Sequence, residues 1–227
     1  MLIDKILSRA MQLWVKSQVS AIDKLNIKIF SKDRQIIKGS IPKVVIEAKN
    51  VVYQQLHISK IKIEGTNIKV NLSQIIKKKP LRLLQPIVIK IRVFLTEEDL
   101  KQSLASPLLS AGLTDIWNRL LSSYEIETNE IHTSYQWNEF SLSKSLIQFD
   151  GVSLNPENNY EIKNSIKIEI DSTNSLLILP ISIITIPEQN FNIDRCVTLN
   201  LGNQTSITDL EITSEYLSIE GTITVFP

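Results

Sequence analysis

The sequence has few of the residues on which disulfide-bonded proteins, metalloenzymes and nucleotide-binding proteins depend. It contains one cysteine, Cys196, which excludes a disulfide within the chain and fits a reducing compartment. Its few glycines form no phosphate-binding spacing of the GxGxxG or GxxxxGK(S/T) type. The two histidines, His57 and His132, are too few for a three-histidine zinc site, and no HExxH or CxxC spacing occurs. We therefore expect no cofactor, no metal and no enzymatic activity.

Long apolar runs and a strong net charge are also missing. The most apolar stretch, residues 176–187, is interrupted by Pro180 and is too short to cross a bilayer. The N-terminal residues carry Asp4, Lys5 and Arg9 among their apolar neighbours, unlike the apolar core of a signal peptide. The net charge of +1 argues against a nucleic-acid partner. We expect a cytoplasmic or peripherally membrane-associated protein.

Apolar residues that alternate with polar ones dominate what is present. Residues 56–72 and 87–95 both follow this period of two, which predicts strands with one apolar and one polar face. The apolar positions include Ile61, Ile63, Ile87, Ile89 and Ile91. Turns or bulges are expected at residues 38–40, 49–50 and 65–67.

Two regions have the spacing of amphipathic helices. Residues 1–25 carry apolar positions at helical spacing that include Trp14, and this helix either packs on a sheet or lies in lipid headgroups. The second region begins at Thr96, a good N-cap, and restarts at Ser106 with Pro107. Leu113 and Trp117 lie on its apolar face; a tryptophan of this kind belongs either to a core or to a membrane interface.

The pattern predicts an α+β fold in a single domain, residues 1–227. Each half begins with helix and continues with strands, and residues 61–66 (IKIEGT) resemble residues 217–222 (LSIEGT). This echo suggests a weak pseudo-repeat with its break near residue 123.

A basic cluster follows the first alternating segment. Lys77, Lys78, Lys79 and Arg82 stand beside the apolar residues 83–84. Such a run either forms a solvated loop or meets phosphate groups, and each cation near an anionic membrane contributes about 1 kcal/mol. The sequence alone leaves both interpretations open.

Several segments resemble the LmeA-like phospholipid-binding family of bacteria, formerly a domain of unknown function. They are residues 63–68 (IEGTNI), 79–84 (KPLRLL), 95–100 (LTEEDL), 103–109 (SLASPLL) and 219–222 (IEGT). The resemblance covers most of the chain. It implies a non-enzymatic protein that binds phospholipid, with a curved antiparallel sheet wrapped on the long N-terminal helix, as in tubular lipid-binding folds.

We therefore expect a phospholipid or a membrane surface as the partner. The strand isoleucines named above, together with Trp14, Leu113 and Trp117, would enclose acyl chains, while the basic cluster would meet the headgroup or the membrane. One alternative is a scaffold protein whose apolar faces are fully packed. A further alternative is a hydrolase that uses a serine with His57 or His132. The oligomeric state is not predicted.

Overall fold

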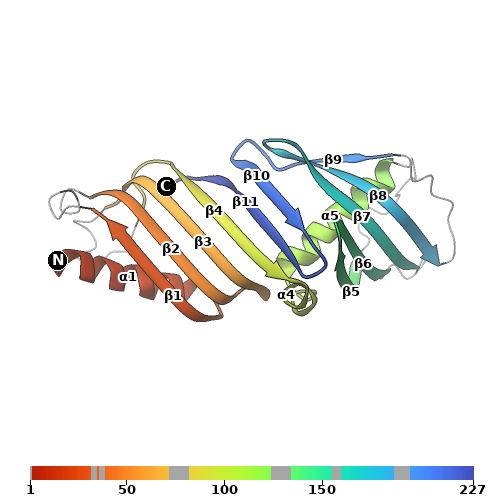
Figure 1. The fold of residues 1–227 in the computed structure, drawn as a ribbon, viewed down its shortest axis with the longest axis horizontal. Helices are drawn as coiled ribbons and strands as arrows, with labels where there is room; N and C mark the ends of the chain where they lie inside the picture. Colours follow the sequence, from red (N-terminus) through yellow and green to blue (C-terminus); the bar gives the residue numbers. More distant parts are fainter. Residues whose placement is uncertain are drawn as a thin grey trace.

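Two antiparallel sheets and three helices make up the part of the chain that the computed structural model describes. The described residues are 2–31, 35, 39–71, 82–123, 134–154, 160–186 and 195–227. Figure 1 shows the two sheets next to each other along the long axis of the molecule, with helix α1 at one end. The mixed, antiparallel architecture predicted from the sequence is confirmed.

The first sheet has six strands in the order β1-β2-β3-β4-β11-β10. Their bounds are β1 Ala21–Phe30, β2 Ser40–Tyr53, β3 Leu56–Lys69, β4 Ile87–Thr96, β11 Tyr216–Val225 and β10 Thr205–Ile212. The last two strands therefore return from the far end of the chain to this sheet, where β11 pairs with β4 and β10 pairs with β11 (Figure 1).

The second sheet has five strands in sequence order, and the helices flank both sheets. The strands are β5 Tyr135–Ser143, β6 Leu146–Ser153, β7 Glu161–Ser172, β8 Ser175–Ile186 and β9 Val197–Asn200. The helices are α1 Leu2–Gln18, α4 Glu97–Gln102 and α5 Pro107–Ser123.

The N-terminal helix is shorter than the sequence pattern predicts. It ends at Gln18, and Ala21–Phe30 forms the edge strand β1. Leu25, which fits the helical stripe, instead lies opposite Ala48 of β2. Pairing along the whole of β2 therefore outweighs the local helical preference.

The hairpin between β2 and β3 turns at Gln54 and Gln55, both of which have positive φ angles of 48° and 63°. Such two-residue turns are usually signalled by Asn-Gly or Asp-Gly. Lys49-Asn50, expected as a turn, lies within β2, and residues 65–67 lie within β3. Neither a turn nor a shift of the β2–β3 register occurs at these two places; Asn50 and Asn67 instead take positive φ angles within their strands.

The caps of the second helical region are confirmed. The Thr96 side chain accepts a hydrogen bond from the Asp99 backbone N–H, and the Asp99 carboxylate accepts one from the Thr96 backbone N–H. The same carboxylate accepts a 2.5 Å hydrogen bond from the Ser59 hydroxyl, which ties α4 to β3. Helix α5 begins at Pro107, as predicted.

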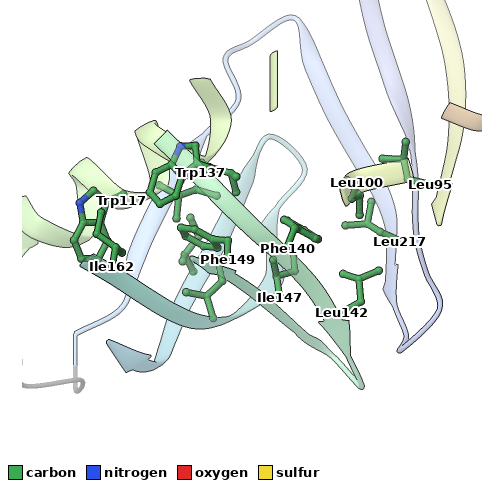
Figure 2. Close-up of a cluster of buried hydrophobic side chains, with 14 of the residues drawn as sticks. Leu95, Leu100, Trp117, Trp137, Phe140, Leu142, Ile147, Phe149, Ile162 and Leu217 are labelled. Carbon is green, nitrogen blue, oxygen red and sulfur yellow. The ribbon is translucent and has the colours of Figure 1, made fainter. Parts of the chain in front are cut away.

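Two hydrophobic clusters hold these elements together. The α1 cluster joins the helix to β1, β2 and β3; its buried residues are Leu7, Ile27, Ile41, Val44, Ile68 and Val70. The junction cluster joins α4, α5 and both sheets, and Figure 2 shows Leu95 and Leu217 of the first sheet near Leu100, with Phe149 and Ile162 in the second. The junction cluster therefore contains residues of both sheets, whereas the α1 cluster belongs to the first sheet alone.

Backbone hydrogen bonds also join the sheets. The N–H of Ser145, in the β5–β6 turn, donates to the carbonyl of Ile212 at 3.1 Å, and the N–H of Ile207 donates to the carbonyl of Thr173 at 2.7 Å. The Glu97 carboxylate of α4 accepts from the N–H of Leu142 on β5 at 2.7 Å. The turns of the second sheet are thus attached directly to β10 and α4.

Candidate functional site

One face of the six-stranded sheet, here called the inner face, is apolar across its strands. In one cross-strand row Ile27 lies opposite Ile46, Ile46 opposite Ile63, and Ile63 opposite Ile91. The same alternation places Ile61, Ile87 and Ile89 on this face. The structure therefore brings together all five strand isoleucines predicted as site residues.

Helices cover the inner face at two places and leave a strip between them. Ile87 packs against the α1 cluster, and Ile61 packs against the junction cluster. Ile63, Ile89 and Ile91 are half-buried and belong to neither cluster. We call these three residues the isoleucine strip.

Ile223 of β11 extends the strip, because it lies directly opposite Ile89 and is also half-buried. The sequence indicates a strand at this position, but nothing local to it signals that β11 pairs with β4. The strip therefore crosses three adjacent strands, β3, β4 and β11.

Of the three helical residues predicted for the site, Trp14 lies on α1, apart from Leu113 and Trp117 on α5. Trp14 of α1 is 52% exposed, at the edge of the helix side that packs on the sheet. Leu113 and Trp117 of α5 are buried in the junction cluster, and Figure 2 shows Trp117 next to Ile162. The structure places Leu113 and Trp117 in packed core rather than beside the isoleucine strip.

Of the predicted basic cluster, only Arg82 is described; Lys77, Lys78 and Lys79 lie outside the described residues. Arg82 is exposed. Its backbone N–H donates to the Asn71 side-chain carbonyl at 2.8 Å, and its carbonyl accepts from the Asn71 N–H at 3.2 Å. The neighbouring Leu83 packs against the α1 cluster. Arg82 is thereby held at the end of the sheet where β4 begins with Ile87.

The opposite face of this sheet, here called the outer face, is polar and carries ordered ion pairs. Glu220 of β11 pairs with Lys90 and Arg92 of β4, and Glu64 of β3 pairs with Lys43 at 2.9 Å and with Lys62 at 3.1 Å. Hydrogen bonds from Lys90 and Arg92 lower the pKa of Glu220 from its ordinary value of 4.5. Lys43 and Lys62 likewise lower the pKa of Glu64.

Replacing Glu220 with glutamine is expected to make stability less sensitive to acid. A carboxylate with a lowered folded-state pKa stabilises the protein above its unfolded pKa of about 4.5, and this contribution is lost as the pH falls through the folded pKa. Glu220→Gln should therefore unfold at lower urea concentration than wild type at neutral pH, with the difference shrinking below pH of about 4. Glu161→Gln, at an exposed position of β7, is the control. A constant difference at every pH would contradict the prediction.

Residues that could carry catalysis are not gathered into a site in the described parts of the chain. The backbone N–H of His57 donates to the Ser103 hydroxyl at 2.8 Å, whereas His132 lies outside the described residues. Within the described ranges no group of three or more His, Cys, Asp or Glu residues could hold a metal ion. None of the described helices has both the length and the apolar character needed to span a bilayer.

Comparison with known proteins identifies a family. The family model described as LmeA-like phospholipid-binding matches residues 2–222, almost the whole chain. No curated protein and no solved structure matches significantly.

Proposed function

Because the chain belongs to the LmeA-like phospholipid-binding family, we propose that it binds a phospholipid and catalyses no reaction. The isoleucine strip is the observation that supports an acyl site. Ile63, Ile89 and Ile91 are large aliphatic side chains on a helix-covered face, yet they contribute to neither packed cluster. Half-buried apolar side chains of this kind gain free energy when an apolar ligand covers them.

The proposed acyl site consists of the strip with Ile61 and Ile87 at its two ends. An acyl chain gains about 0.8 kcal/mol for each methylene that it buries. We propose that Trp14, which is exposed on α1, covers the chain from the side of the helix. We further propose that α1 and the sheet enclose the chain in the manner of tubular lipid-binding folds. Leu113 and Trp117 are left out of this site, because their side chains are already buried in the junction cluster.

For the headgroup we propose the basic cluster predicted from the sequence. Arg82 supports this assignment, because it is exposed and is held at the end of the sheet where Ile87 begins the strip. Lys77, Lys78 and Lys79 precede it in the same β3–β4 connection. A lipid lying along the strip would have its phosphate at this end of the sheet.

Co-purifying lipid tests the proposal. Native mass spectrometry of freshly purified protein should show a mass increment of one or more phospholipids, and organic extraction should recover them. A scaffold with a fully packed core would carry none. Protein that is free of phospholipid in both measurements, and that takes up none from vesicles, would contradict the proposed function.

The headgroup assignment is tested with a variant in which Lys77, Lys78, Lys79 and Arg82 are all replaced by glutamine. It should keep its affinity for zwitterionic phospholipid and lose its preference for anionic phospholipid, because the acyl strip is untouched. An unchanged preference would assign the four cations to a solvated loop.

A further inference from the structure

Three lysines stand side by side on the outer face of the six-stranded sheet. Lys24 of β1 lies directly opposite Lys49 of β2, and Lys49 lies directly opposite Lys60 of β3. All three are exposed. Like charges at directly opposed positions of neighbouring strands repel one another and destabilise the sheet. The row is therefore unfavourable in the free protein and becomes favourable when an anion lies on it.

Four other cations on this face are paired with carboxylates: Lys43 and Lys62 with Glu64, and Lys90 and Arg92 with Glu220. Within the described part of the chain, the three lysines of the row have no ion-pair partner. Two carboxylates adjoin the row: Glu47 accepts a hydrogen bond from the Asn26 side chain at 3.3 Å, and Asp23 accepts one from the Asn50 side chain at 2.7 Å. Three lysines beside two carboxylates leave an excess of positive charge at this position.

The row also lines a hollow. A depression of about 590 Å³ is bordered by Lys24, Lys49 and Lys60 and by the next residue of the row, Phe94; its lining also includes Glu47 and Ile61. The ammonium group of Lys60 lies 4.9 Å from the centre of the Phe94 ring, which itself stacks on Tyr216. The lining of the hollow thus combines an aromatic ring with several cations, a combination suited to the interface of a membrane.

We infer that this hollow, the outer basin, docks the protein onto the surface of an anionic bilayer. Its three lysines span three strands, or about 10 Å, which exceeds one phosphate group and suits several adjacent headgroups. Phe30 and Val88 are exposed on the same face of the sheet. They lie in another cross-strand row, about 20 Å along the strands from the row of lysines. A bilayer can contact both the lysines and these two apolar side chains, whereas a soluble phosphate ion can bind only the lysines.

The outer basin and the proposed acyl site share Ile61, which lines both, but the lysines of the basin and the isoleucine strip lie on opposite faces of the sheet. A phospholipid lying on the inner face cannot reach Lys24 or Lys49 through the backbone of β1 and β2. The inference rests on the proposed function only for the chemical class of the partner. The sheet would then have one face for a bound lipid and one face for the membrane.

Vesicle flotation tests the docking surface. Full-length protein and the variant Lys24→Gln/Lys49→Gln/Lys60→Gln are mixed with vesicles made of equal parts phosphatidylcholine and phosphatidylglycerol. Removing three membrane-facing lysines should weaken partitioning roughly 100-fold. Binding of wild type should also decrease when salt is raised from about 0.1 M to 1 M, where the screening length falls from about 10 Å to 3 Å. The variant should be at least as heat-stable as wild type, because the repulsion along the row is removed.

The control variant Lys16→Gln/Lys144→Gln/Lys163→Gln changes the net charge equally, at exposed positions on α1, in the β5–β6 turn and on β7. It should retain most of the binding. Equal losses in the two variants, or unchanged binding of the basin variant, would overturn the inference. Lipid that co-purifies with the protein is measured separately and should be the same in both variants. If the proposed acyl site were wrong, the measurement of co-purifying lipid would show it, and the flotation result would not change.

Discussion

Replacing Phe149 with alanine is expected to lower the free energy of unfolding by about 3–5 kcal/mol, because the vacated space in a packed core closes only in part. Phe149 of β6 is fully buried, and its ring meets the Trp137 ring edge-on at a centroid distance of 5.1 Å. A loss of this size is a large share of the stability of an ordinary domain. Urea unfolding followed by circular dichroism measures it.

The same variant tests whether the two sheets form one folding unit, as the single-domain prediction requires. The junction cluster continues from Phe149 through Leu100 of α4 to Leu95 and Leu217 of the first sheet (Figure 2). We therefore expect hydrogen exchange to accelerate in β2 and β3 as well as in β6 and β7. Leu100→Ala, at the junction itself, should weaken both sheets equally.

Phe30→Ala is the matched control, because Phe30 is 52% exposed at the end of β1. Its effect should stay within about 0.5 kcal/mol. If Phe149→Ala accelerated exchange only in the second sheet, and unfolding showed two separate transitions, the sheets would be independent units.

Local features of the fold were predictable because their causes lie within a few residues. The Thr96 cap, the start of α5 at Pro107 and the alternation of β4 depend on side chains near one another in the sequence. The end of α1 and the Gln54-Gln55 turn were not predictable in this way. Both depend on the pairing of β2 with β1 and β3, which the residues at those positions do not signal.

The candidate site likewise has a part that the sequence predicted and a part that depends on tertiary structure. Alternation correctly placed Ile63 and Ile91 on one face, but it could not distinguish a half-buried strip from the fully buried Leu113 and Trp117. Burial depends on which helix covers which strand, and that is a property of the tertiary structure. Ile223 was missed for a related reason, since β11 lies far from β4 in the sequence.

The basic residues show most clearly what the sequence alone does not reveal. The contiguous Lys77–Lys79 run attracts attention in the sequence, whereas Lys24, Lys49 and Lys60 are scattered among ordinary strand residues. Only the strand register makes neighbours of them. A row of like charges built by pairing across strands leaves no contiguous signal, so a search for charge runs does not find it.

Replacing Ile63 and Ile91 together with threonine is expected to weaken phospholipid binding roughly tenfold or more. Each substitution replaces an ethyl group with a hydroxyl where an acyl chain would lie, and about 1.4 kcal/mol corresponds to a factor of ten in affinity. The two residues lie opposite each other on β3 and β4, outside both packed clusters. Titration of lipid-stripped protein with a fluorescent phospholipid measures the effect.

The control uses the same substitutions in the same cross-strand row. Ile27 is buried in the α1 cluster and Ile46 packs against it. Ile27→Thr/Ile46→Thr should therefore lower the free energy of unfolding more than Ile63→Thr/Ile91→Thr does, while changing lipid affinity less. The opposite ordering, with the strip variant losing stability and keeping its lipid, would show that the strip is packed core. The scaffold interpretation would then replace phospholipid binding at this face, because a side chain already satisfied by protein contacts has no further free energy to gain from an acyl chain.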